Sequence, residues 1–173
     1  MIEALSGTLP GDVDRMTLSM SLAVLRRAYR SAADKAVAHL GLSQALAYPV
    51  VMLGRLGDGV RQGAVAHVLA IDDSSLVRLV DQLVEDGLVE RREDRTDRRA
   101  RSLFLTERGH AMAAQVEAAL AALRDRLYAD IADADIRACL KVFAVLEQRL
   151  GCATPDISHL GARIAPEGGA TAP

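Results

Sequence analysis

Apolar residues recur at steps of three and four along most of the chain, the spacing of one face of an α-helix. The first stripe covers about residues 16–40 and ends before Gly41, a residue type that commonly follows a helix C-terminus. Ser43 is the expected N-cap of a second helix that runs to about residue 56. Inside it, Pro49 predicts either a kink or the start of the regular part.

Two shorter helices are expected next, at residues 60–69 and 74–86, the second closed by Gly87. The apolar residues of the second helix are expected to face inward: Leu76, Val77, Val80, Leu83 and Val84. Polar residues occupy its opposite face: Ser74, Ser75, Arg78 and Gln82. Two short helices joined by a tight turn, the second with a polar face, predict a helix-turn-helix unit.

The segments 88–92 and 101–105 alternate in part and flank a charged turn, which predicts a β-hairpin. A further helix is expected from Thr106, and a last one over about 133–150, each with its own apolar stripe. The fold class is therefore expected to be mainly α with a small β-hairpin. Composition agrees, because half of the residues are hydrophobic and only 3% are aromatic.

The overall charge does not indicate a nucleic-acid partner, since the formal net charge is -2. Residues 91–101 differ, because their six arginines and three acids give a local excess of positive charge. A helix beside this hairpin would enter the major groove, where base pairs are distinguishable. The arginine loop would reach towards the minor groove, whose negative potential attracts arginine. The alternative is a charged turn that is only exposed to solvent. The preceding helix-turn-helix disfavours this alternative, because a DNA-binding wing has this position and this charge.

In these segments the sequence resembles the MarR family of winged helix-turn-helix regulators. Three motifs carry the resemblance: Leu83-Val84-Glu85-Asp86-Gly87-Leu88-Val89 ending the recognition helix, Asp97-Arg98-Arg99 in the wing, and Leu105-Thr106-Glu107-Arg108-Gly109 opening the next helix. The resemblance covers roughly residues 15–150 and implies a transcriptional regulator, expected to be a repressor, on double-stranded operator DNA. It implies a minor-groove role for Arg99, with Asp97 holding the wing.

Further DNA contacts are expected on both parts of this unit. Arg78 is the expected reader of a base edge, and Arg61 a contact to the DNA backbone. The other wing arginines are expected to contact phosphates or to stabilise the wing through ion pairs. The full set of expected DNA-binding residues is Arg61, Ser74, Ser75, Arg78, Gln82, Arg91, Arg95, Asp97, Arg98 and Arg99.

The composition of the two ends, together with the resemblance, predicts a division of the chain into segments. Residues 1–13 are expected to be a flexible leader and 152–173 a disordered tail. Residues 42–106 form the expected DNA-binding lobe, and 14–41 with 107–151 form a helical dimerisation platform. Because one subunit would hardly cover the platform's apolar stripes, a symmetric homodimer on a pseudo-palindromic operator is expected. An intramolecular bundle is the alternative.

Regulation by a small aromatic or phenolic acid is the mode that the resemblance implies. A carboxylate in a cleft between platform and lobe would need cationic or hydroxyl groups among apolar neighbours. The candidates are Arg26, Arg30, His39, Tyr48 and Met52, each of which also has an ordinary structural interpretation as surface cation or core residue.

Other functions fit the sequence less well. A redox-sensing regulator would need a reactive thiol, but Cys139 is expected to be buried and inert, and only Cys152 to be exposed. The histidines show no metal-ligand spacing, and no cofactor loop or nucleophile motif indicates an enzyme. An architectural DNA-binding protein without a ligand would carry more widespread positive charge. No signal peptide or membrane span is expected, so the cytoplasm is the default location.

Overall fold

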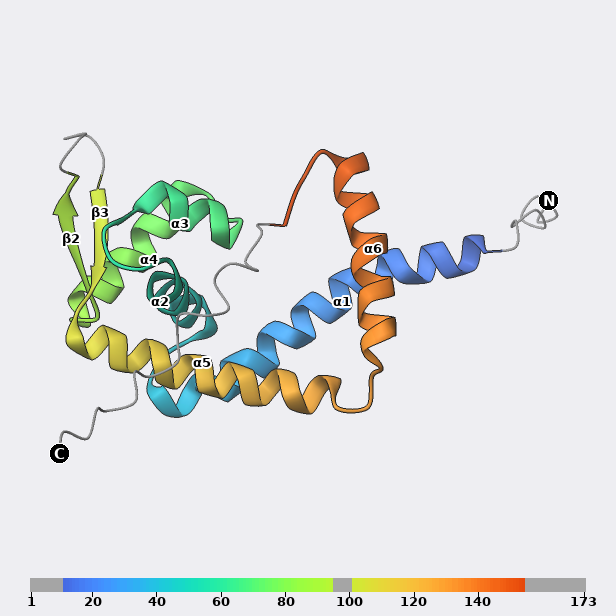
Figure 1. The fold of residues 1–173 in the computed structure, drawn as a ribbon, viewed down its shortest axis with the longest axis horizontal. Helices are drawn as coiled ribbons and strands as arrows, with labels where there is room; N and C mark the ends of the chain where they lie inside the picture. The colour runs from blue at the N-terminus through green and yellow to red at the C-terminus, as the bar shows by residue number, and fades with distance from the viewer. Residues whose placement is uncertain (1–10, 95–100, 155–173) are drawn as a thin grey trace, which may run out of the picture.

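The computed structural model describes residues 11–94 and 101–154, which form a helical molecule with one small sheet (Figure 1). The first helices are α1 (Asp12–Val37), a short 3₁₀ turn (Ala38–Leu40) and α2 (Gln44–Leu56). They are followed by β1 (Val60–Arg61), α3 (Gln62–Leu69), α4 (Asp73–Glu85), β2 (Val89–Glu93) and β3 (Arg101–Leu105). The chain continues with α5 (Glu107–Tyr128) and α6 (Asp133–Leu150). The expected fold class, mainly α with a small hairpin, is confirmed.

The sheet has three antiparallel strands in the order β1-β3-β2. The hairpin of β2 and β3 pairs in the register Val89 with Leu105 and Arg91 with Leu103. Its third strand, β1, pairs Val60 with Leu103 and was not expected from the sequence. A strand of two residues is too short to show alternation, so the pattern of the sequence offered no signal for it.

Helix α2 forms the centre of the core. Most of its side chains are buried, and the helix continues through Pro49, so its regular part does not start there. Around it pack the inner faces of α3, α4, α5 and the hairpin, and the C-terminal part of α1. Residues that share this core include Val37, Val50, Val65, Leu76, Val80, Leu83, Leu103, Val116 and Leu120.

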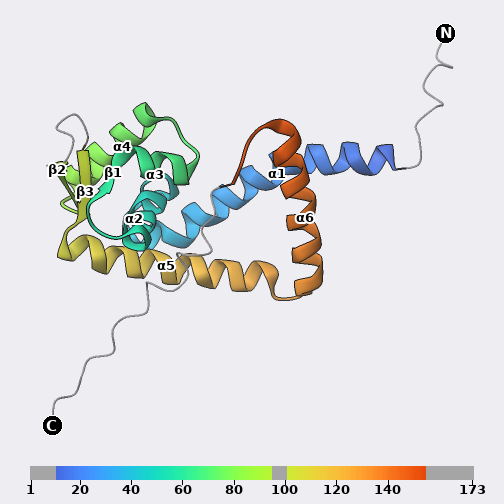
Figure 2. The same ribbon diagram turned by 45° about the horizontal axis from the view of Figure 1, so that its top comes forward.

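Two corrections concern helices that were expected to be covered. On α4, Val77 and Val84 do not face inward but are 37% and 39% exposed, because the buried stripe narrows to Leu76, Val80 and Leu83. On α6 no residue is buried, so Cys139 is exposed rather than inert in a core. Figures 1 and 2 show why α6 is exposed: it crosses near the part of α1 that does not pack on the core, far from the sheet.

The junction between lobe and platform is fixed by close packing. Thr106 caps α5 by accepting a hydrogen bond from the Gly109 N–H at 2.9 Å, and its own N–H donates to the Leu88 carbonyl at 3.1 Å. A Cβ on Gly109 would lie 2.0 Å from that Leu88 oxygen, so only glycine fits. The motif that opens α5 therefore anchors this helix to the end of the helix-turn-helix.

Within the described residues, no single helix has both the length and the hydropathy of a membrane span. The helical stretch Asp12–Leu40 and α2 meet these criteria only as a pair bent by 77°.

Candidate nucleic-acid interface

The N-terminus of α4 is held by one carboxylate. Asp72 is the N-cap and accepts the Ser75 N–H at 2.8 Å. It also accepts the hydroxyls of Ser74 at 2.5 Å and Ser75 at 2.7 Å. These hydrogen bonds hold the pKa of Asp72 well below its usual range. Ser74 and Ser75, expected as DNA contacts, therefore serve the cap here, and their oxygens keep lone pairs for other donors.

The outer face of α4 presents a free cation. Arg78 and Gln82 are both exposed, as the sequence predicted for this face. Among the described residues, Arg78 has no hydrogen-bond or ion-pair partner. A guanidinium without an internal partner is available for bidentate hydrogen bonds to a guanine edge or to phosphate.

The arginines of the two wing strands are paired with acids. Arg91 Nη2 lies 2.7 Å from Asp81 Oδ1, which ties β2 to the outer face of α4. Arg92 pairs with Glu90 at 2.7 Å and lies over the Phe104 ring, 4.3 Å from its centroid. On β3, Arg101 pairs with Glu93 at 3.1 Å. Of these pairs, only that between Arg101 and Glu93 joins the two wing strands. The wing residues Arg95, Asp97, Arg98 and Arg99 lie outside the described residues.

Arg61 ends β1 and precedes α3, and its guanidinium meets Asp94 with two hydrogen bonds of 3.0 and 3.2 Å. Ser102, a buried polar residue on β3, donates its hydroxyl to the same carboxylate at 3.2 Å. The sequence placed Arg61 on the DNA backbone and assigned no role to Asp94 or Ser102. Their spacing of 33 and 8 residues gives no signal before the sheet is known.

The residues expected to bind an effector are only partly brought together. Tyr48 on α2 and Tyr29 on α1 meet through their hydroxyls at 3.4 Å. Burial, together with this contact to Tyr29, raises the pKa of Tyr48. Met52 is buried in the core, whereas Arg26, Arg30 and His39 are exposed. The sequence analysis did not assign Tyr29 to the effector site. Tyr29 follows Leu25 by four residues, which puts both on the apolar stripe of the first helix.

A charged cluster links α2 and α5 close to these tyrosines. Arg55 donates to both carboxylate oxygens of Glu117, and Arg124 donates to one of them at 2.9 Å. Burial opposes ionisation of Glu117, but the hydrogen bonds from the two guanidinium groups outweigh it and lower its pKa. In the described part of the chain, no group of three or more His, Cys, Asp or Glu side chains is arranged to hold a metal ion.

Comparisons with known proteins agree with this architecture. The MarR family model matches residues 50–100, from the middle of α2 into the wing. The transcriptional regulator PA3341 is 31% identical, with a TM-score of 0.69, over 78% of this chain and 98% of its own. A MarR family regulator from Rhodococcus sp. RHA1 is 29% identical, with a TM-score of 0.61, over 82% and 96%.

A third relative is known with a bound molecule. CouR from Rhodococcus jostii RHA1, solved bound to p-coumaroyl-CoA, is 26% identical, with a TM-score of 0.66, over 75% of this chain and 90% of its own. The three relatives are matched over nearly their full length. The chain belongs to the MarR family of transcriptional regulators.

Proposed function

We propose that this regulator is a repressor that binds a pseudo-palindromic operator as a homodimer and leaves it when a small aromatic or phenolic acid binds. The observation that carries the DNA-binding part is the capped helix α4, whose unpaired Arg78 faces outward beside a wing rich in arginine. Members of the family bind DNA and form dimers, so the outer face of α4 is the natural surface for base readout.

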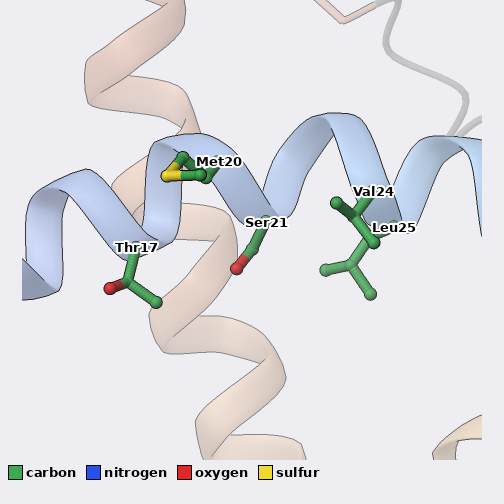
Figure 3. Close-up of a pocket in the computed structure, with 5 residues that line it drawn as sticks. All are labelled: Thr17, Met20, Ser21, Val24 and Leu25. Atoms are coloured by element: carbon green, nitrogen blue, oxygen red, sulfur yellow. The ribbon is translucent and has the colours of Figure 1, made fainter.

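A second copy of the chain is the proposed cover for the exposed apolar faces of α1 and α6. Figure 3 shows one part of this surface, a shallow depression along α1 lined by Thr17, Met20, Ser21, Val24 and Leu25. Contiguous apolar surface of this kind indicates an interface. The large exposed apolar residues on the two helices, on the end of α5 and in the turn between α5 and α6 are Val13, Met16, Leu18, Met20, Leu22, Val24, Leu25, Leu127, Tyr128, Ile131, Leu140, Val142, Val145 and Leu150.

The effector class is supported by chemistry at the α1–α2–α5 junction. The hydroxyls of Tyr29 and Tyr48 lie 3.4 Å apart, and the positive charge of Arg124 acts on Tyr48. These groups suit a phenol or carboxylate beside apolar side chains. The p-coumaroyl group bound by CouR is itself phenolic, which supports the same class for this chain. Arg26, Arg30 and His39, which are exposed, and Met52, which is buried, stay candidates for contacts to this effector.

The test is fluorescence anisotropy on the DNA upstream of the protein's own gene, with a scrambled duplex as control, with and without aromatic acids. We expect preference for the first duplex and its loss when an acid of the right class is added. Arg78→Ala should relax sequence preference by about 1–3 kcal/mol, the contribution of one bidentate pair. Arg126→Ala, an equal change of charge in the last turn of α5, should leave the preference intact.

Each part of the proposal has its own contrary result. Binding that no acid reverses would remove the aromatic effector but keep the DNA regulator. If neither this duplex nor any member of a random-sequence library is preferred, sequence-specific binding is wrong. For the dimer, Met20→Asp should shift the molecular mass in light scattering towards the monomer, and an unchanged mass would contradict the interface.

A further inference from the structure

The base of the wing is organised around one carboxylate, in a group that we call the Asp94 cluster: Arg61, Asp94 and Ser102. Arg61 comes from β1, Ser102 from β3, and Asp94 directly follows β2. All three strands are therefore joined by side chains at a single point. The Asp94 side chain is only 12% exposed, so its charge is shielded from water more than that of an ordinary surface pair.

The Asp94 cluster connects the wing to the helix-turn-helix. Asp94 is the last residue before the arginine-rich segment 95–100, which returns to the sheet at Arg101. Arg61 is at the same time the residue before α3, the first helix of the helix-turn-helix. Because β1 has only two residues, its backbone hydrogen bonds alone fix the wing weakly to that helix. The bidentate contact between Arg61 and Asp94 supplements them.

An acid at this place has an electrostatic cost for a DNA-binding protein. A carboxylate beside the arginines of the wing lowers the local positive potential that attracts phosphate. If its charge were its main effect, removing it would strengthen binding to any duplex. A structural contribution to DNA binding has the opposite sign, so the two roles are separable by experiment.

We propose that Asp94 is a positioning residue for DNA recognition: it holds the wing to the helix-turn-helix through Arg61 and Ser102, so that wing and α4 engage one operator together. Arg61 acts through Asp94 and is not primarily a contact to the DNA backbone. This role rests on the proposed function of the chain as a sequence-specific DNA-binding protein.

The first test compares Asp94→Asn with Glu93→Gln, which removes an equal charge from the neighbouring, more exposed residue. Affinity is measured on the preferred duplex and on a scrambled one at several salt concentrations. We expect Asp94→Asn to weaken binding to the preferred duplex about tenfold, with a salt slope lower by about one contact. On the scrambled duplex it should bind as well as the wild type or more tightly. Glu93→Gln should bind both duplexes at least as well as the wild type.

A second measurement does not depend on DNA. Amide hydrogen exchange of the free full-length protein should become faster in β2 and β3 of Asp94→Asn and stay unchanged in α2 and α5. The melting temperature of the variant should stay within a few degrees of that of the wild type. Arg61→Gln should give the same faster exchange in β2 and β3 with a similarly small change in melting temperature. The double variant should exchange little faster than either single variant, because both substitutions remove the same contact.

The outcomes are distinct. Tighter binding of Asp94→Asn to both duplexes, strictly additive effects with Arg61→Gln, or unchanged exchange in the hairpin would each overturn the positioning role while leaving the proposed function intact. Equal weakening on both duplexes would show a general loss of structure or of phosphate contacts instead. If the wild type prefers no duplex, the proposed function fails and the role of Asp94 in recognition fails with it.

Discussion

Glu117 offers a quantitative test of how the DNA-binding lobe is joined to the long helices. It accepts three hydrogen bonds, two from Arg55 on α2 and one from Arg124 on its own helix α5. The side chains of Arg55 and Glu117 are 15% and 16% exposed, so this pair is shielded from solvent. We therefore expect Glu117→Gln to destabilise the fold measurably, although the new side chain has almost the same shape.

The magnitude follows from the contacts. A hydrogen bond to a charged group contributes about 1 kcal/mol more than one between neutral groups. In glutamine an NH2 group, which cannot accept, replaces one of the two oxygens, so at least one of the three bonds is lost and the others are weakened. Because Arg124 is 39% exposed, its share is reduced by solvent screening, which leaves a net loss of about 2 kcal/mol. For a chain of this length, that loss corresponds to a decrease in Tm of about 4–8 °C.

The stability difference between wild type and Glu117→Gln should also depend on pH in a defined direction. The pKa of Glu117 is lowered from its ordinary value of 4.5, so the native state stabilises the ionised form. The stabilisation is fully present above pH 4.5 and is lost as the pH falls through the lower native pKa. The difference in stability between wild type and Glu117→Gln should therefore be constant between pH 7 and about 5 and should shrink below about 4.5.

The assay is urea unfolding followed by circular dichroism at one fixed protomer concentration, since dimerisation would otherwise change the apparent stability. Glu90→Gln is the matched control, because Glu90 also pairs with an arginine at 2.7 Å but is 53% exposed. It should change stability by no more than about 0.5 kcal/mol. Equal effects of the two substitutions, or a difference for Glu117→Gln that is no smaller at pH 3 than at pH 7, would refute the reasoning.

The remaining predictions concern two glycines near helix N-termini and the N-cap of α4. Gly109→Ala should prevent accumulation of folded protein in an expression and solubility assay, because the new Cβ would lie 2.0 Å from the Leu88 oxygen. Gly63→Ala, on α3 with its nearest neighbouring atom 4.0 Å away, should instead stabilise the protein by about 0.5–1 kcal/mol in urea unfolding; a loss of stability would contradict the open space seen there. Asp72→Ala should lower the Tm through loss of the α4 cap, whereas Asp72→Asn should retain most of it, since asparagine caps as well as aspartate. Because the pKa of Asp72 is lowered from its ordinary value of 3.8, the effect of Asp72→Ala should be constant above that pH and should shrink progressively as the pH falls from about 3.8 towards the much lower native pKa; an effect independent of pH would assign it to something other than the carboxylate.

The parts of the fold that could be predicted are those written in local patterns. The helix stripes, the glycines after helices and the charged turn of the hairpin each depend on residues close in sequence, and the predicted elements match the structure within a few residues. Helix α1, for example, begins at Asp12 instead of near Met16. The local pattern could not predict which apolar residues of a helical stripe are covered by other elements. Val77 and Val84 have the same chemistry as Val80, and only the packing of α4 leaves them exposed.

The candidate site divides in the same way. The exposure of Arg78 could be predicted because helical periodicity alone puts it opposite Leu76 and Val80. Pairs between distant segments could not, and these include Arg91 with Asp81 and Arg61 with Asp94. A run of arginines shows a local excess of charge, but not which guanidinium groups are already neutralised by acids elsewhere in the fold.

The fixed junction at Gly109 has a mechanical consequence. Because α5 starts in close contact with the Leu88 carbonyl, we expect the lobe and this helix to move together. A helix of 22 residues is about 33 Å long, close to the advance of one turn of B-DNA. In the proposed dimer, a tilt of only about 5° at the far end of α5 would displace its near end by about 3 Å. In that dimer the helix would act as a lever arm, so small changes of angle at the subunit interface would change the separation of the two copies of α4.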